Sequence, residues 1–394
     1  MKILRFGYRP EILLLLSNIR YANKSEFSLR LEILGLLLCG LLSTSAQAES
    51  RVTLYGSIDL GVDLASNVGA SHQFRMANAV GTSTMWGLLG HEELGGGYAT
   101  VFRVESGFNA ANGDAGGGLA FSRQAYVGLL SDRFGTLTIG RQWSPMTDLI
   151  SPLSLNGVYG GWYSAHPNDL DNLNYTFSIP NAVKYVSQNI DGVSVEIMYA
   201  FGGQPGQFSA NAVFSGALSW RHGGFTIGVG YLQINDPQTT VIGYQSVGGY
   251  VNTVYGADLA QARSQRIAGI GASYSYGPVQ VFGNLTQVDF PQRFSSLNTR
   301  FRNAELSVAY RINPAAIAYG GFTDTEGHAP LTSKKTHYRQ INLGVDYSLS
   351  KRTSVYADAV LQSAGGGVPA QIAGLDAASN SHQAIGHVGV KHLF

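Results

Sequence analysis

The most constraining feature of this 394-residue chain is a two-residue alternation of apolar and polar side chains that recurs along most of its length. In the stretch INLGVDYSL, every second residue from Ile341 to Leu349 is apolar and the residues between them are not. Successive side chains of a β-strand point to opposite faces, so this period predicts a strand with one dry and one wet face. A soluble sandwich would cover the dry face with a second sheet, whereas a membrane barrel would expose it to lipid.

The wet faces favour the barrel. They carry charged side chains in strand after strand, namely Asp59, Glu196, Glu305, Asp346 and Asp358. Burying these groups in a protein core would be costly unless each found a partner, whereas a water-filled lumen needs no such pairing. A sandwich of this length would also be divided into several domains, and no linker is visible.

Tight turns alternate with long polar connections along the chain. Gly95–Gly97, Asp191-Gly192 and Gly277-Pro278 are turns of the kind that hairpins require. Long connections are predicted near residues 65–83, 109–120, 145–181, 203–210, 235–263, 289–301, 325–337 and 363–381. Short periplasmic turns and long extracellular loops are the layout of outer-membrane barrels, and the runs number about sixteen. We therefore predict an all-β fold, a transmembrane antiparallel β-barrel of about 16 strands.

The N-terminal segment predicts export. Lys24 and Arg30 precede the apolar run at residues 33–42, and Ala46 and Ala48 form a small-x-small cleavage site. We expect residues 1–48 to be a signal peptide with an over-long N-terminal extension, and residues 49–394 to be the barrel domain. Past residue 48, no apolar run reaches the 18 residues that a membrane helix needs.

The predicted mature chain has no feature of a nucleic-acid or cofactor protein. Cleavage removes six of the 26 Lys and Arg residues and three of the 25 Asp and Glu residues, which leaves a slightly acidic chain. Such a chain has no basic footprint for nucleic acid. The single cysteine, Cys39, lies in the segment that is removed, so neither a disulfide nor a cysteine-bound metal is expected. No phosphate-binding glycine loop with its lysine is present, and we expect no cofactor.

Five motifs in a fixed order carry a family resemblance: LYG, ELGGG, ESGFN, RQAYVGL and GRQ. With them, the chain resembles the general porins of β-proteobacteria, of the Neisseria, Burkholderia and Comamonas type, over essentially residues 50–394. The resemblance implies a sixteen-stranded barrel in the outer membrane of a Gram-negative bacterium, a homotrimer, and passive diffusion of ions and small hydrophilic solutes. The partners it implies are outer-membrane lipid and lipopolysaccharide, the barrel-assembly machinery and the solutes themselves.

The C-terminal residue fits this resemblance. Phe394 ends an alternating run, and proteins of this kind typically end on such an aromatic residue as a signal to the barrel-assembly machinery. An aromatic residue of the membrane-interface belt is the structural alternative. The last strand must also pair with the first, because lipid does not tolerate an open sheet edge.

The resemblance places the pore constriction at the third long loop, roughly residues 144–181, folded into the barrel. This loop carries Asp148, Asp169 and Asp171 and no Lys or Arg, and these acids are either constriction charges or ordinary solvated loop charges. Selectivity would follow from the charges that line the narrowest part of the pore.

On the wall opposite the loop, the resemblance points to Arg123 and to the acidic Glu105. Arg103 lies two residues before Glu105, on the same strand face, where it would neutralise that carboxylate. Arg123 shares strand parity with apolar residues, so a bulge or a subunit contact must intervene. Further wall candidates are Arg141, which is alternatively a strand-end interface residue, Lys184, which faces inward if its neighbours face out, and the rim charges Arg263 and Arg266.

Two positions depart from the family pattern. Thr84-Met85-Trp86-Gly87 stands where family members often have Ser-Arg-Trp-Gly, and Ile179-Pro180-Asn181 lacks an arginine that is usual there. With two arginines missing and three loop aspartates retained, we expect a weaker anion preference than the family's basic constrictions give, or a cation preference.

Three other functional classes stay open. A substrate-specific channel would use an apolar patch in the inserted loop, formed by Tyr159, Trp162 and Tyr163. An adhesin or phage receptor would use the long loops. An enzyme would need a Ser/His or Asp/His set at the rim, and the candidate histidines, which fall in predicted loops without a recognisable motif, are His166, His328 and His337.

Overall fold

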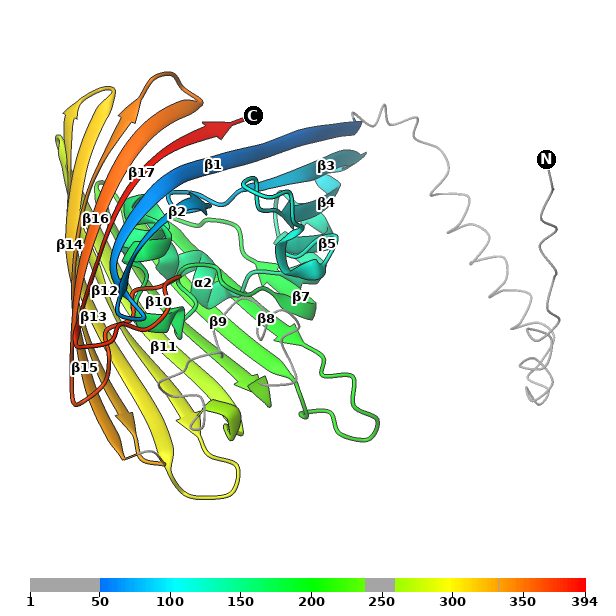
Figure 1. Cartoon of the computed structure of the whole chain (residues 1–394). Coiled ribbons are helices and arrows are strands. Elements are labelled where there is room, and N and C mark those ends of the chain that lie inside the picture. The colour runs from blue at the N-terminus through cyan, green and yellow to red at the C-terminus, as the bar shows by residue number, and fades with distance from the viewer. Residues whose placement is uncertain (1–49, 238–258, 332) are drawn as a thin grey trace, which may run out of the picture. The chain divides into compact units, whose positions relative to one another are not determined.

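A computed structural model of the chain describes residues 50–237, 259–331 and 333–394 (Figure 1). The predicted signal peptide, with Ala46 and Ala48 at its cleavage site, lies outside the described residues. Most of the described chain is β-strand. The strand segments are β1 (Ser50–Val68), β2 (Ser71–Asn78), β3 (Met85–Gly95), β4 (Tyr98–Gly107), β5 (Gln124–Ser131), β6 (Gly135–Gln142), β7 (Ile179–Val186), β8 (Val193–Ala200), β9 (Val213–His222), β10 (Phe225–Asn235), β11 (Ser264–Tyr276), β12 (Val279–Pro291), β13 (Asn298–Asn313), β14 (Ala316–Ala329), β15 (Lys334–Ser348), β16 (Thr353–Gly365) and β17 (His382–Leu393).

These segments form one closed antiparallel barrel. Each strand from β3 onward pairs with the next, and β17 pairs with β1 in the register Ser57↔Leu393 to Ser66↔Ala384. β2 and β3 both pair with the other edge of β1, end to end, so they are two parts of one interrupted strand. The barrel therefore has 16 strand positions, as the sequence predicts.

The barrel closes through the C-terminal residue. The backbone N–H of Phe394 donates to the carbonyl of Gly56 at 3.0 Å, and the N–H of Gly56 donates to the carbonyl of Phe394 at 3.1 Å. The predicted pairing of the last strand with the first is thus confirmed, and no barrel edge is left open at this seam.

The alternation of apolar and polar residues in the sequence corresponds to the alternation of outward and inward side chains in the barrel wall. On β15, Leu343 is 56% exposed on the outer face, while Gln340 and Asn342 are buried on the inner face. The apolar side chains therefore point outward, to where lipid lies in a membrane barrel, and the polar ones point inward. In the described ranges, no helix has the length and apolar character that membrane crossing requires.

Three of the predicted long connections are wrong. Residues 65–83 were expected to be a loop, but β1 continues to Val68 and a two-residue turn leads directly into β2. β12–β13 and β14–β15 likewise extend through most of 289–301 and 325–337. In these strand ends the outward residues are polar as well, for example Arg302 and Glu326, so the contrast between the two faces disappears from the sequence.

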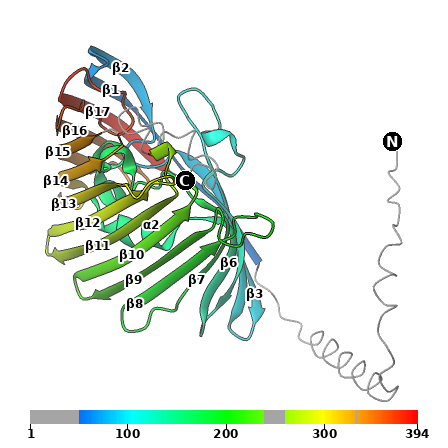
Figure 2. The same ribbon diagram turned by 90° about the horizontal axis from the view of Figure 1, so that it is seen from below.

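The wall differs in height around the barrel (Figures 1 and 2). β5, β6, β7 and β8 have 8 residues each. β13, β14 and β15, by contrast, have 16, 14 and 15 residues. A tilted strand needs about 9–11 residues to cross a bilayer, so only the second group is long enough to face lipid along its full height.

The long connection between β6 and β7 lies against the inner face of the wall. It contains α2 (Pro145–Ile150) and the short helical turns η3 (Ser151–Leu153), η4 (Asn156–Gly160), η5 (Trp162–Ser164) and η6 (Pro167–Asp169). Ser144 caps the N-terminus of α2, because its hydroxyl accepts a hydrogen bond from the Thr147 N–H. We call residues 143–178 the inner segment.

Glycines on β10 and β11 make room for α2. A Cβ atom added at Gly230 would lie 2.8 Å from the sulfur of Met146, and one added at Gly269 would lie 2.5 Å from its terminal methyl. The inward-facing hydroxyl of Ser215 on β9 accepts a hydrogen bond from the Met146 N–H at 3.3 Å. The main apolar core lies here, between the inner segment and the wall, and includes Ile150, Leu173, Phe177, Leu232 and Ile267.

Candidate functional site

A buried histidine fixes the inner segment to the wall. His166, which is 1% exposed, lies between Asp171 of the same segment (Nδ1–Oδ2 2.6 Å) and Glu305 of β13 (Nε2–Oε2 3.1 Å). Asp171 also accepts hydrogen bonds from Thr286 and Asn303 on the wall. The backbone N–H of Leu155 donates to the other oxygen of Glu305 at 2.7 Å, so this carboxylate binds the segment at two points.

The charges of this anchor stabilise one another. Burial opposes a charge on His166, but the adjacent Asp171 and Glu305 raise its pKa to about 10. Burial likewise opposes a charge on Asp171, yet His166 holds the pKa of that carboxyl below its ordinary value. At neutral pH the site therefore contains an imidazolium between two acidic residues, which is the arrangement that makes a buried charge tolerable.

Asp169 lies inside the segment and makes local bonds only. It accepts a hydrogen bond from the Asn174 N–H at 3.0 Å and another from the Thr176 hydroxyl. Burial and the neighbouring Asp171 raise the pKa of Asp169 to about 7. This side chain therefore shapes the segment and is not directed at open water.

A second ion-pair cluster holds the start of the segment. Lys184 on β7 faces inward and is 8% exposed. Its ammonium group pairs with Asp148 of α2 and with Glu196 of β8 (Nζ–Oε2 3.2 Å), and it donates to the carbonyl of Trp143 at 3.3 Å. Asp148 and Lys184 thus neutralise each other, with Glu196 as a further acid.

Glu105 lies behind two arginines. It is 4% exposed and accepts hydrogen bonds from the Tyr55 hydroxyl (2.6 Å) and the Gln124 amide (3.1 Å). Arg103 and Arg123 flank it, with closest N–O distances of 3.7 and 3.6 Å. Arg123 precedes the first residue of β5, so the strand's alternation does not direct its side chain, and this resolves the parity conflict in the sequence.

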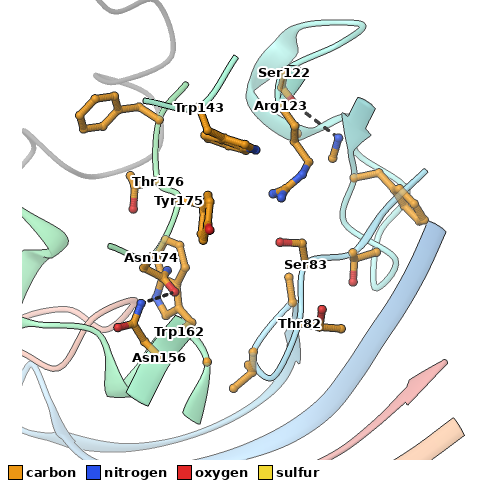
Figure 3. Close-up of a pocket in the computed structure, with 18 of the residues that line it drawn as sticks. Thr82, Ser83, Ser122, Arg123, Trp143, Asn156, Trp162, Asn174, Tyr175 and Thr176 are labelled. Atoms are coloured by element: carbon orange, nitrogen blue, oxygen red, sulfur yellow. Dashed lines mark hydrogen bonds between the residues drawn. The ribbon is translucent and has the colours of Figure 1, made fainter. Parts of the chain in front are cut away.

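A cavity of about 400 Å³ opens beside Arg123 (Figure 3). It is bounded by the inner segment, by residues 79–84 between β2 and β3, and by the connection after β4. Trp143, Tyr175 and Trp162 line one side, Thr82 and Ser83 lie across from them, and Arg123 points into the opening. The backbone N–H of Trp162 donates to the Val80 carbonyl at 2.8 Å, so the inner segment touches the connection between β2 and β3.

Aromatic contacts hold the arginine and its neighbours in place. The Arg123 guanidinium lies 5.1 Å from the Trp143 ring centroid, and the Trp143 and Tyr175 rings meet edge to face at 5.2 Å. Arg141, also in the lining, donates from Nε to the Ser122 carbonyl at 2.9 Å. Tyr175 has a φ of 56°, a left-handed conformation that is costly for an aromatic residue and typical of functional sites.

A second cavity, of about 580 Å³, continues the first toward the short-turn end of the barrel. The two linings share Gly81, Thr82, Asn156 and Gly157, so the cavities adjoin at these residues. The second lining includes the turn that joins β15 to β16 and the cations Lys351, Arg352 and Lys391. Among the residues that the structure describes, neither lining contains an Asp or Glu residue. We call the two cavities together the passage.

The structure brings only some of the predicted constriction residues to the passage. Arg123 and Arg141 line it, and Glu105 and Arg103 lie behind Arg123. The three loop aspartates are held in ion pairs or local hydrogen bonds, so the acidic lining on which the expected cation preference depends is not formed there. Sequence reasoning missed the cations of the second cavity, because Lys351 and Arg352 lie in a short turn between strands, where charged residues are ordinary.

The predicted apolar patch of the inner segment is not formed either. Tyr159 stacks on Tyr319, and Tyr163 is buried with its hydroxyl bonded to Asp63, so only Trp162 lines the passage. The three candidate rim histidines do not form one site. His166 belongs to the buried anchor, while His328 and His337 lie on strands, where loops were expected.

Comparison with known proteins identifies the class. Residues 35–365 match the model of a family described as Gram-negative porin, and the chain belongs to this family. It is an outer-membrane porin of a Gram-negative bacterium, as the sequence motifs indicate.

Curated relatives cover most of the chain. An outer membrane porin protein of Bordetella pertussis is 28% identical, over 79% of this chain and 89% of its own length. Outer membrane porin protein 32 of Delftia acidovorans is 26% identical, over 80% and 85%, respectively. Among solved structures, the anion-selective porin from Comamonas acidovorans has the same fold, with a TM-score of 0.70 at 21% identity over 88% of this chain and 100% of its own.

Proposed function

We propose that this porin is a passive diffusion channel whose passage favours small anions. The observation that carries the proposal is the composition of the passage: two joined cavities with cationic side chains in both linings and no carboxylate in either. Charges at the narrowest part of a channel set its selectivity, and low-dielectric walls strengthen their effect.

The nearby acids are bonded within the protein: Asp59, at 0% exposure, accepts hydrogen bonds from the Thr82 N–H and the Tyr356 hydroxyl. Glu105 is 4% exposed and is already bonded to Tyr55 and Gln124, so a solute meets Arg123 first. Lys391 is paired with Asp346 at 2.5 Å and contributes less than Lys351 and Arg352. The structural neighbour from Comamonas acidovorans is named anion-selective, which agrees with this proposal.

The low part of the wall supports a homotrimer. β5 to β8, at 8 residues each, are shorter than the roughly 9–11 residues that a lipid-facing strand needs. Their outward side chains are nevertheless apolar, with Val127, Leu129 and Ile139 about half exposed in the single chain. Contact with two further copies would cover this surface, and we propose that assembly.

We further propose that residues 1–48 are removed on export, after Ala46-Gln47-Ala48, and that Phe394 is read by the barrel-assembly machinery. The position of Phe394 at the seam between β17 and β1 supports the second point, because the strand that carries the signal is also the one that completes the barrel.

Single-channel recording of the protein purified from outer membranes tests the channel. In symmetrical KCl, we expect current steps that are linear with voltage and that appear in groups of three, one for each subunit. Reconstituted liposomes should also swell in isotonic solutions of small uncharged sugars. Folded, heat-modifiable protein that produces neither steps nor swelling would overturn the proposal, because it would show a closed barrel.

A further inference from the structure

The cavity beside Arg123 combines a cation with aromatic walls. The aromatic residues of its lining are Phe108, Trp143, Trp162, Tyr175 and Phe177. Trp143, Tyr175 and Trp162 all come from the inner segment and lie on one side of the opening into which Arg123 points (Figure 3). Passage of small inorganic anions requires the cation but not the rings, so the aromatic wall calls for a different solute.

The rings have two different roles. Trp143 is 7% exposed, and its ring centroid lies 5.1 Å from the Arg123 guanidinium, so this ring positions the cation. Tyr175 and Trp162 are only partly buried, and both line the cavity. The left-handed φ of 56° at Tyr175 is costly for an aromatic residue, and such strain is concentrated at functional sites. The exposed parts of these two rings form the surface that a solute in the cavity contacts.

The Arg123 guanidinium keeps hydrogen-bonding capacity for a solute. Among the described residues, its Nε has no hydrogen-bond partner, and the nearest carboxylate oxygen, on Glu105, lies 3.6 Å away. Glu105 receives its own hydrogen bonds from Tyr55 and Gln124. The end of the Arg123 side chain points into the opening. A carboxylate there would supply the missing acceptors, because arginine binds carboxylates through two parallel N–H donors.

Charge and aromatic surface together define the solute. A small inorganic anion would pair with Arg123 but leave the rings in contact with water, and an uncharged sugar would leave the guanidinium without a counter-charge. A molecule that has both a carboxylate and an aromatic ring satisfies both parts of the lining. The volume of about 400 Å³ lies near the lower end of the roughly 300–1,000 Å³ that is usual for ligand pockets, which suits a single-ring compound.

We propose that this cavity binds small aromatic carboxylates, of the benzoate class, as they cross the channel. The carboxylate contacts the Arg123 guanidinium, and the ring packs against Tyr175 and Trp162. Lys351 and Arg352 in the adjoining cavity then attract the released anion toward the short-turn end of the barrel. This binding site presupposes the proposed channel function, on which the inference rests, and adds a preferred class of solute.

Block of the ion current by added solutes tests the site. Benzoate, cyclohexanecarboxylate and benzyl alcohol are titrated against single wild-type channels in planar bilayers with KCl at neutral pH. Cyclohexanecarboxylate has the charge and ring size of benzoate without its π-system, so benzoate should block at a concentration roughly two- to tenfold lower. Benzyl alcohol has the ring without the charge, and its blocking concentration should be roughly tenfold or more above that of benzoate.

Two substitutions separate the charge from the ring. Arg123→Gln should raise the blocking concentration of benzoate roughly tenfold or more. Tyr175→Asn removes a ring from a position whose left-handed φ asparagine tolerates, and it should bring the blocking concentrations of benzoate and cyclohexanecarboxylate close together. Arg133→Gln and Tyr276→Asn, at short turns outside both linings, are the matched controls and should be blocked by benzoate as the wild type is.

The outcomes distinguish this inference from the channel proposal. Channels that conduct KCl but are blocked equally by benzoate and cyclohexanecarboxylate, or whose block by benzoate is unchanged in Arg123→Gln, would overturn the inference alone. Protein that does not conduct would contradict the proposed function. Calorimetry of the purified protein in detergent with the same three solutes would then decide the inference: preferential binding of benzoate supports it, and absence of that preference overturns it.

Discussion

At the scale of single residues, the inner segment depends on charges that are satisfied only in one arrangement. His166 contacts Asp171 in its own segment and Glu305 on the wall, and all three side chains are buried. Removing one member of such a group leaves the others charged in a low-dielectric site, which is worse than replacing the whole group.

The first prediction concerns this anchor. Substitution of His166 by Gln should lower the free energy of unfolding by about 3–5 kcal/mol, because Asp171 and Glu305 would stay buried without a cation. Urea titration of the refolded protein measures the change. His328→Gln, at an exposed histidine on β14, is the control and should change the stability by less than about 0.5 kcal/mol. Equal effects of the two substitutions would show that His166 has no anchoring role.

The second prediction is a pH dependence. The pKa of His166 is raised from 6.5 to about 10 in the folded state, so its stabilising effect is complete below pH 6.5 and is lost as the pH rises through 10. The pKa of Asp171 is lowered from 3.8, so its contribution is present above that pH and is lost in stronger acid. Melting temperatures measured from pH 6 to 11 should therefore fall more steeply for the wild type than for His166→Gln, and parallel curves would contradict the assignment.

At the scale of elements, α2 packs against strand positions that are occupied by glycine. Gly230 and Gly269 leave the space that Met146 fills, and Gly271 does the same for Leu153. The inner segment lies close to the wall because these strand positions carry no Cβ. The glycine content of β10 and β11 thus determines how much of the lumen stays open.

The third prediction follows from the packing of α2 against these glycines. Gly269→Val should displace α2, since the new side chain would overlap Met146, and overpacking of this kind costs about 1–3 kcal/mol. The strands themselves remain paired, so the barrel should still assemble, with altered single-channel conductance and more frequent current fluctuations. Gly386→Val, at a strand glycine with open space around it, should have the single-channel conductance and current noise of the wild type. If Gly269→Val had the same conductance and the same low current noise as the wild type, this account would be contradicted.

The sequence predicted the elements well where the strands cross lipid. In β15, the alternation of INLGVDYSL corresponds to side chains that face lipid and lumen in turn. The alternation could not be recognised at the strand ends above the lipid. There, Arg302 and Glu326 occupy outward positions, so the sequence of a strand resembles that of a polar loop. The inner segment was recognised through the family resemblance, since its composition alone does not show that it lies against the wall.

At the scale of the whole molecule, the two sides of the barrel face different surroundings. The low wall of β5 to β8 suits contact with protein, and the high wall of β12 to β15 suits lipid with headgroups above it. The passage lies beside the inner segment, between the connection from β2 to β3 and the turn from β15 to β16, and its cationic lining is the basis of the proposed selectivity.

The lining of the passage was only partly accessible to sequence reasoning. Arg123 and Arg141 were named because they match family motifs. The partners of the loop aspartates were not predicted, because Asp171 is held through His166 by Glu305, which lies 139 residues from His166 in the chain, and Asp148 is held by Lys184 on β7. Long-range pairing of this kind leaves no periodic signal, so the sign of the charge in the passage required the structure.

The fourth prediction concerns the arginine at the centre of this lining. Arg123→Gln removes a cation from the passage and leaves Glu105 nearer to passing ions, so the ratio of chloride to potassium permeability should fall severalfold. Arg133→Gln, at a periplasmic turn away from the passage, should leave the ratio unchanged. Both variants are compared with the wild type in planar bilayers. Equal permeability ratios for all three proteins would show that Arg123 does not contribute to ion selectivity.

The most direct measurement is the zero-current potential of the wild-type channel across a KCl gradient in a planar bilayer. A passage lined by Arg123, Arg141, Lys351 and Arg352 without carboxylates predicts a potential with the sign of chloride selectivity. A potential with the sign of potassium selectivity would contradict the account, because it would mean that ions meet the aspartates of the inner segment and not the cations of the passage.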